Sequence, residues 1–567
     1  MPAKNPFRSK HNNKISQRDS SHLARHQNQQ QQQRDLTMNQ PNIQRSDLYF
    51  SRTISFPFTL SYWPLIEQAL SDPIQNSSQL NQVLINIQKA VCEAVGMTPF
   101  TPVQSQTSLT LLLEGKIFGE EWKQRDQFFE TTLPFMMDLV KQSPNILGPD
   151  AYQLYGQVHS TIISNEGLLP VMGTLNRIPV LARPKSKVMT FNKLECACIL
   201  ANAFFLTWPR LADTREASVQ MPSINFDTLF KDSRPSSIAK LLMIIHYFER
   251  ISARNYNEIA SHGSMTVIRK CVDARRVKDQ IRLDSFMPLS DMSVHTEGSL
   301  EQCENALHAD FANCYIGGGV LRGGAVQEEI RFCLSPEAIV TRLFVEKLDD
   351  NEVLYILGTE QFSEHDGYGS SLKFKGDYVD KNYIVDGFGN RQFTSQIVAF
   401  DSLYYTHHDK VNQWRSEHID REIVKAYAAF SVTPNRLNVN IHTKISTGNW
   451  GCGAFNCDKE LKFLIQYLAA SISQCSLHYY TFGDYELENK IEKFVHTITT
   501  HKFSVLRIYQ VLIGMWSLDV LPNLETENYY PSTLKFVVET LLKEQLEESL
   551  QQMDESDSQL FAPSIDL

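Results

Sequence analysis

The sequence predicts an α/β protein in which helices cover both faces of a sheet, preceded by a helical region. Before about residue 255, apolar residues recur at helical spacing. After about residue 260, short β-rich segments alternate with helical ones, which is typical of a mostly parallel sheet between two layers of helices. The length of 567 residues implies two or three folded units with tails.

The first 48 residues differ in composition from the rest of the chain. They are basic, of low complexity and rich in Gln, and such a segment cannot bury enough apolar area to offset its chain entropy, so we expect a disordered tail over 1–48. Residues 1–45 carry eight Lys and Arg and two Asp, a net charge of +6. Since the whole chain has a net charge of −10, the remaining residues have a net charge of −16. Such a negative net charge outside the tail argues against a broad nucleic-acid-binding surface, and we expect no direct DNA binding.

Helix-period apolar segments predict a helical accessory domain over 49–255. The segments are Trp63–Leu70, Leu80–Val95, Phe128–Val140, Leu194–Phe205 and Ile238–Ile251. The longest apolar run, Cys196–Trp208, is too short to span a membrane, and Asn202 interrupts it, so we expect a buried helix there. The ten cysteines form no C-x-x-C pair, which predicts free thiols and no zinc site.

The second domain is predicted over 256–545, followed by an acidic tail over 546–567. The expected strands are Leu307–Ala312, Val353–Leu357, Ile397–Leu403, Leu437–Ile445 and Leu477–Phe482. The expected helices are Ser335–Lys347, Glu417–Phe430 and Asp458–Ser473. Ser335 and Asp458 stand where a helix prefers its capping residue. The segment after Lys543 has seven acids and no Lys or Arg, which predicts an amphipathic helix that ends as a solvated tail.

A glycine-rich loop follows the strand expected at Leu307–Ala312. Gly317-Gly318-Gly319 and then Gly323-Gly324 would let backbone N–H groups approach an anion. A flexible linker is the other interpretation of such a run, but linkers are polar, whereas apolar residues flank this one. The setting therefore favours a ligand-binding loop at the carboxyl end of a strand.

Two adjacent glutamates, in Gln327-Glu328-Glu329, follow this loop and precede an alternating apolar set that begins at Ile330. Adjacent glutamates usually form a solvated face, but because these lead into a buried element we expect at least one in a ligand cleft. Successive side chains diverge, so the two should not flank one bond as the paired carboxylates of a glycosidase do. One could act as acid and base while its neighbour holds substrate, and crowding with Asp310 would raise one pKa.

Two further loops end predicted strands. Thr447–Phe455 lies between a strand and a helix, which is the arrangement that binds phosphates through free amides and the helix dipole. It fits neither the Walker A nor the Gly-x-Gly-x-x-Gly pattern, so an NTPase, a kinase or a hydride-transfer enzyme loses its usual support. Thr481–Asp484 carries Phe482, and the turn Gly367–Gly369 carries Tyr368; alone, each indicates only core packing or a plain turn.

Together these blocks resemble the poly(ADP-ribose) glycohydrolases. The family signature is matched by Gly317-Gly318-Gly319, seven residues, and Gln327-Glu328-Glu329. The other blocks, in the family's order, are Leu200–Phe205, Ile224–Phe226, Asp310–Asn313, Gly358–Gln361, Thr447–Phe455 and Tyr480–Asp484. The resemblance covers residues 60–550 in round numbers.

The resemblance implies a macrodomain-like three-layer α/β/α fold with a twisted mixed sheet, an N-terminal all-helical accessory domain, and no metal or other cofactor. It implies hydrolysis of ribose–ribose O-glycosidic bonds of poly(ADP-ribose) to release ADP-ribose. Glu329 would be the general acid and then the base, Glu328 would bind hydroxyls of the scissile unit, and Asp310 would support the carboxylate cluster. The implied substrate-binding residues are Leu300, Glu301, Asn313, Gly318, Gly319, Gln327, Tyr368, Asn449, Trp450, Gly451, Cys452, Gly453, Ala454, Phe455 and Phe482.

Two other functions stay open. A macrodomain that binds ADP-ribose without cleaving it needs the glycine loops but not the acids, so the intact Gln327-Glu328-Glu329 favours the enzyme. A scaffold protein is favoured only by the low-complexity start and the acidic end. We expect poly(ADP-ribose) on modified proteins as the partner, a monomer with no membrane association, and residence in the nucleus, the cytoplasm or both.

Overall fold

The computed structural model describes residues 53–94, 107–115, 124–148, 161–164, 167–170, 177–183, 187–209, 221–431, 441–515 and 532–560. The predicted disordered tail and the end of the predicted acidic tail lie outside these residues. Ile54–Leu567 forms one compact unit. None of the described helices has the length and apolar character that crossing a bilayer requires.

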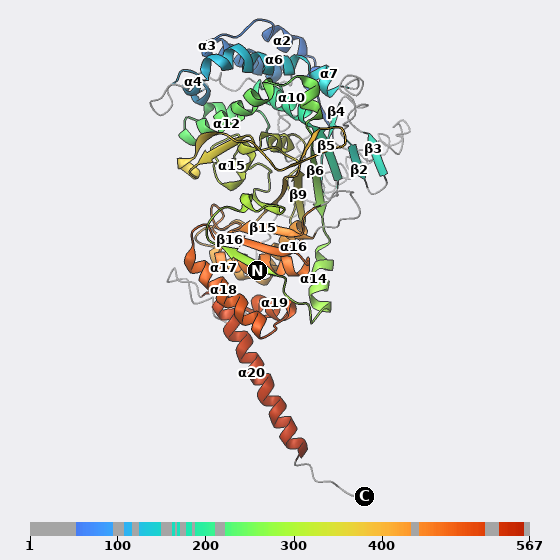
Figure 1. Ribbon diagram of the computed structural model, residues 1–567, viewed down its shortest axis with the longest axis vertical. Helices are drawn as coiled ribbons and strands as arrows, with labels where there is room; N and C mark the ends of the chain where they lie inside the picture. The colour runs from blue at the N-terminus through green and yellow to red at the C-terminus, as the bar shows by residue number, and fades with distance from the viewer. Residues whose placement is uncertain are drawn as a thin grey trace, which may run out of the picture. The chain divides into compact units, whose positions relative to one another are not determined.

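A ten-stranded mixed sheet runs through this unit (Figure 1). In spatial order its strands are β3 (Gly167–Pro170), β2 (Thr161–Ser164), β5 (Lys187–Asn192), β6 (Ser264–Cys271), β9 (Glu352–Leu357), β14 (Gln396–Asp401), β8 (Leu307–Ala312), β15 (Lys444–Gly448), β16 (Ser476–Tyr480) and β7 (Met292–His295). Pairing is parallel from β14 to β7 and antiparallel from β3 to β14. The α/β class is confirmed, and the sheet is mixed rather than mostly parallel.

The N-terminal part of the unit is mostly helical, as predicted. Its helices are α2 (Trp63–Ala69), α3 (Ser77–Ala94), α4 (Thr107–Leu113), α5 (Arg125–Gln127), η3 (Phe128–Thr132), α6 (Leu133–Lys141), α7 (Ser143–Leu147), α10 (Lys193–Phe204), α11 (Asp227–Lys231), α12 (Pro235–Ser252) and α13 (Tyr256–Ser261). Every residue of α10 is buried, as expected for its apolar run. Strands β2, β3 and β5 also lie in this part and join the central sheet, which was not predicted because they are short and β5 continues directly into α10.

The helices that follow β6 are α14 (Ala274–Leu283), α15 (Gln327–Leu334), α16 (Ser416–Phe430), α17 (Lys459–Ile472), α18 (Tyr485–Thr500), α19 (Val505–Gly514) and α20 (Thr533–Leu560). The shorter elements are η5 (Leu300–Gln302), η6 (Pro336–Leu343), η7 (Gly369–Ser371), η8 (Lys410–Trp414) and the hairpins β10 (Ser363–Asp366) with β11 (Lys373–Asp377) and β12 (Tyr383–Val385) with β13 (Arg391–Phe393). None of the ten cysteines, all of which lie in the described residues, forms a disulfide, in agreement with the prediction.

The buried element predicted after Glu329 is the helix α15, in which every residue from Glu328 to Leu334 is buried. One local prediction needs correction. The helix predicted at Ser335–Lys347 is the 3₁₀ helix η6, and Ser335 lies at its N-cap without capping it, because its hydroxyl makes no hydrogen bond to a described residue. By contrast, Asp458 caps α17 as predicted, accepting a bond from the amide of Leu461 at 2.9 Å.

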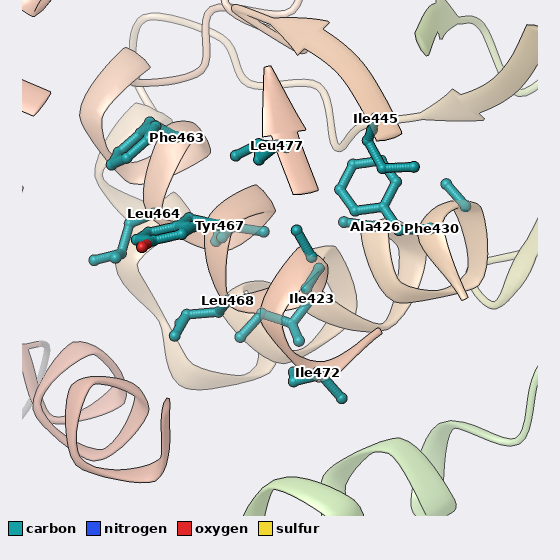
Figure 2. Packing of buried hydrophobic residues seen from close by; sticks show 14 of the residues in the cluster. Ile423, Ala426, Phe430, Ile445, Phe463, Leu464, Tyr467, Leu468, Ile472 and Leu477 are labelled. Atoms are coloured by element: carbon teal, nitrogen blue, oxygen red, sulfur yellow. The ribbon is translucent and has the colours of Figure 1, made fainter. Parts of the chain in front are cut away.

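A large buried cluster forms where α16 and α17 meet the sheet (Figure 2). In Figure 2, Leu468 and Ile472 of α17 point toward Ile423 of α16, and Leu477 of β16 lies in the same cluster. All four side chains are at most 2% exposed. Since α17 follows the glycine loop that ends β15, this core holds the base of that loop in place.

Leu468→Ala should lower the free energy of unfolding by about 3 kcal/mol, because it removes buried methyl groups and leaves a cavity. Urea unfolding of both proteins measures the difference. Leu65→Ala is the matched control, since Leu65 also lies in a helix but is 52% exposed. Equal losses for the two variants would contradict the packing described here.

Candidate active site

The three loops singled out in the sequence meet at one edge of the sheet. They follow β8, β15 and β16, which are neighbouring parallel strands, so their carboxyl ends lie together. A cavity of about 1640 Å³ lies there, lined by residues of all three loops. Ligands of open α/β sheets bind in this position.

Most of the predicted site residues line this cavity. The lining includes Glu301, Asn313, Gly318, Gly319, Gln327, Glu328, Glu329, Tyr368, Phe482 and every residue from Asn449 to Phe455. Asp310 lies behind the wall and is fully buried. Leu300 is also fully buried, in a small cluster with Cys303 and Tyr480, so its side chain does not line the cavity as a ligand contact would.

Both glutamates of the signature are in the cavity wall, and both bind the same loop. Glu328 accepts bonds from the amides of Gly317 at 2.6 Å and Asn313 at 2.9 Å. Glu329 accepts bonds from the amides of Gly319 at 2.7 Å and Val326 at 2.9 Å. Successive residues of a helix point about 100° apart. The two long side chains nevertheless converge on one loop, whereas the sequence predicted that they diverge.

The close approach of the carboxylates explains one glycine. A Cβ on Gly318 would lie 2.5 Å from Oε2 of Glu328 and 2.5 Å from Oε1 of Glu329, closer than atoms can approach. Its φ of +45° also lies in the left-handed region that favours glycine. Any side chain at this position would displace both carboxylates.

The carbonyls of the same loop bind two buried cations that the sequence analysis missed. Nζ of Lys240, from α12, donates to the carbonyls of Gly319, Val320, Arg322 and Gly324. Nη1 of Arg342, from η6, donates to the carbonyls of Ile316 and Gly318. Burial lowers the pKa of Lys240 to about 8 and that of Arg342 to about 10. A lysine amid the apolar residues of α12 was the available signal for Lys240.

The surroundings of Asp310 and Glu328 raise the pKa of both carboxyl groups. Burial is the main cause for both; the charge of Glu329 adds to it at Asp310, and the charges of Asp310 and Glu329 add to it at Glu328. The amides that bind Glu328 act in the opposite direction. Neither oxygen of Asp310 has a hydrogen-bond partner among the described residues. The surroundings of Asp310 and Glu328 thus favour the protonated form of these two carboxyl groups.

The loop after β15 presents free backbone amides. Within the described part of the chain, the amides of Gly453, Ala454 and Phe455 donate to no protein acceptor. Trp450, which belongs to this loop, anchors it to the rest of the protein. Its Nε1 donates to the carbonyl of Phe400 at 3.0 Å, and Nζ of Lys462 lies 3.7 Å from the centre of its ring. Such an array of amides on a rigid base suits an anion.

Three side chains shape the rest of the wall. Gln327 donates to Oε1 of Glu301 at 2.9 Å and accepts from the amide of Phe311 at 2.9 Å, so these groups are held as one unit. The hydroxyl of Tyr368 accepts from the amide of Gln327 at 3.2 Å, while its ring is 58% exposed. Phe482 has a φ of +57°, a strained value for an aromatic residue, and is 45% exposed. Exposed aromatic rings at a cavity can stack on a base or ribose.

No group of three or more His, Cys, Asp or Glu among the described residues is placed to hold a metal ion.

Asp310→Asn should remove a pH dependence of stability. Because the native pKa is raised above 3.8, the stabilisation from this carboxyl is complete below about pH 4 and is lost as pH rises towards the native pKa. The wild type should therefore lose free energy of unfolding relative to Asp310→Asn as pH rises, as measured by urea unfolding at each pH. Asp279→Asn, at an exposed site, is the control. A constant difference between wild type and Asp310→Asn would contradict the raised pKa.

Lys240→Met should lower the free energy of unfolding by about 3 kcal/mol, because it leaves buried carbonyls without a donor. Hydrogen exchange should also quicken at the amides of residues 316–324. Unfolding and exchange are compared with those of Lys231→Met, where the lysine is exposed. Unchanged exchange in the loop would show that Lys240 does not hold it.

Comparison with known proteins gives consistent matches. A model of the poly(ADP-ribose) glycohydrolase macro domain fold matches residues 280–489, and a model of the helical domain of that enzyme matches residues 120–269. A solved poly(ADP-ribose) glycohydrolase mutant from Deinococcus radiodurans, in complex with ADP-ribose, is 14% identical and covers 41% of this chain and 95% of that one. Its TM-score of 0.25 is too low to add to the assignment.

Curated relatives match over longer stretches. Poly(ADP-ribose) glycohydrolase 1 of Arabidopsis thaliana is 30% identical over 488 residues, which are 72% of this chain and 83% of the relative. Poly(ADP-ribose) glycohydrolase 2 of Caenorhabditis elegans is 32% identical over 312 residues, 54% of this chain and 60% of the relative. Probable poly(ADP-ribose) glycohydrolase 2 of Arabidopsis thaliana is 26% identical, over 83% of this chain and 94% of the relative. The chain belongs to the poly(ADP-ribose) glycohydrolase family.

Proposed function

We propose that this protein hydrolyses the ribose–ribose O-glycosidic bonds of poly(ADP-ribose) and releases ADP-ribose. One observation carries the proposal: the two glutamates of the signature are fixed by loop amides in the wall of a cavity that also contains free amides for a diphosphate. The family membership supports the same substrate.

Glu329 is proposed as the general acid and base. Its carboxyl lines the cavity and is held by two amides on different oxygens, so it can approach a substrate oxygen without moving. It protonates the departing ribose oxygen as the glycosidic bond breaks, and then takes a proton from the water that attacks the oxocarbenium-like carbon. Negative charge on the bound diphosphate favours that cation.

The remaining roles follow from position. Glu328 lies deeper than Glu329, with 2% against 6% exposure, which suits binding hydroxyls of the scissile unit. Asp310 supports both from behind the wall. The amides of the 449–455 loop bind the diphosphate, and the exposed rings of Tyr368 and Phe482 contact the ligand from the cavity mouth.

Glu301 is proposed to bind adenine, and Asn313 and Gln327 are proposed to contact ribose or phosphate. Leu300 acts only indirectly in this scheme: its carbonyl accepts from Ser446 at 2.7 Å, which anchors the turn that presents Glu301. No resident metal or other cofactor takes part in these steps.

Glu329→Gln should bind ADP-ribose with an affinity within about threefold of wild type and lose about 10²–10⁴-fold in kcat, because the amide keeps its shape but cannot transfer the proton. Calorimetry with ADP-ribose and chromatography of the ADP-ribose released from poly(ADP-ribose) measure the two effects. Glu486→Gln, 80% exposed at its side chain, is the matched control.

The outcomes separate the enzyme from its alternative. Release of ADP-ribose by Glu329→Gln at near the wild-type rate would refute the role of this residue. A wild-type protein that binds the polymer but releases nothing would be a reader of ADP-ribose, and the proposed function would fail.

A further inference from the structure

Arg331 is a buried cation without a protein partner. It lies in α15, two residues after Glu329, and is only 6% exposed. Among the described residues it makes no side-chain hydrogen bond and no ion pair, and its Nε is enclosed without an acceptor. A guanidinium carries five N–H donors, and leaving them unsatisfied in a protein interior is costly. Arg331 also lines the cavity, so a ligand there can reach it.

Neutralising the charge of the nearby carboxylates does not explain why the Arg331 side chain is buried without a partner. Arg331 lowers the pKa of Asp310, against the larger effect of burial, so its charge is felt there. Yet no carboxylate lies within ion-pair distance of it in the described residues, and its N–H donors remain free. A planar fork of donors suits an anion with several oxygens, of which phosphate is the common biological case.

Further side chains that can donate hydrogen bonds to a phosphate line the same cavity. Helix α15 packs against β10, and the charge of Arg331 acts on Tyr378, which follows β11. From this hairpin and the segment after it, His365, Lys375 and Lys381 line the cavity, and Nδ1 of His365 has no partner in the described part of the chain. Lys375 also forms ion pairs with Glu364 at 3.4 Å and Asp366 at 3.8 Å, but all three side chains are exposed, so these pairs are weak. These groups come from elements other than the 449–455 loop, so they form with Arg331 a second region of donors.

We propose that Arg331, with Lys375 and His365, binds the diphosphate of a second ADP-ribose unit, the one that carries the leaving oxygen. This rests on the proposed function. The leaving oxygen belongs to a ribose of the next unit, and that ribose carries its own diphosphate. Glu329 and Arg331 both line the cavity, so a ligand bound at Glu329 can extend to Arg331. The cavity of about 1640 Å³ also exceeds the roughly 300–1,000 Å³ usual for a single small ligand.

Arg331→Gln tests the site by comparing ligands of different length. The variant should bind ADP-ribose within about twofold of wild type, because one unit does not reach Arg331. Its KM for a two-unit ADP-ribose oligomer and for long polymer should rise about tenfold, as expected for loss of a charge-assisted contact. The slope of log affinity for the polymer against log salt, measured with Glu329→Gln as the background, should fall by about one. Arg276→Gln, 88% exposed at its side chain, is the control.

Three outcomes would overturn the proposal. An equal loss of affinity for ADP-ribose and for the oligomer would place Arg331 in the site of the first unit. A lower kcat with a displaced pH profile and an unchanged KM would show that Arg331 only balances the carboxylates. An unchanged KM and kcat would show that it contacts no substrate.

A second variant keeps the test decisive if Arg331→Gln does not fold. Lys375→Gln, with a side chain 52% exposed, should raise the KM of the two-unit oligomer about threefold and leave ADP-ribose binding unchanged. An unchanged KM in this variant would also count against the second region. If the wild type releases no ADP-ribose at all, the proposed function fails first, and oligomer binding by calorimetry still tests the second region.

Discussion

The site depends on the peptide groups of one glycine loop being bound from both sides. The amides of Gly317 and Gly319 hold the two glutamates, while the carbonyls of Gly318 and Gly319 accept bonds from Arg342 and Lys240. The Ile316–Gly317 and Gly318–Gly319 peptides each lie between a carboxylate and Arg342, and the two charges polarise each peptide in the same sense. The arrangement fixes the position of two carboxylates in a dry wall and brings cations close enough to make their burial tolerable.

The parallel half of the sheet decides where this loop meets its counterpart. Because β8, β15 and β16 are parallel neighbours, the glutamates that follow β8 and the amides that follow β15 lie at the same edge. The antiparallel half extends the same sheet. It includes β5, which lies in the helical N-terminal part, and β6, which follows it. The helices before β6 are therefore joined to the sheet that carries the site by continuous strand pairing.

Local patterns allowed the sequence to predict the loops but not what holds them. Glycines, the paired glutamates and the cap at Asp458 are adjacent in the chain, so their spacing carries the signal. Lys240 and Arg342 lie 79 and 24 residues from loop carbonyls that they bind, and no short pattern links such positions. The same limit explains Leu300, which was predicted to contact ligand but lies in a buried cluster behind the wall. Strands β2, β3 and β5 were missed because pairing with one another and, for β5, with β6 defines them, rather than their own pattern.

These contacts give the helical part a direct role in the site. Lys240 belongs to α12, a helix of that part, and its ammonium group is almost completely enclosed by carbonyls of the glycine loop. Burial lowers its pKa to about 8, and the four carbonyls give the ammonium group acceptors in place of the water that it has lost. Without α12 the loop would have carbonyls exposed to solvent and glycines free to move, and the amides would no longer fix Glu328 and Glu329. The accessory helices are thus needed for the geometry of the carboxylates, whatever they contribute to substrate binding.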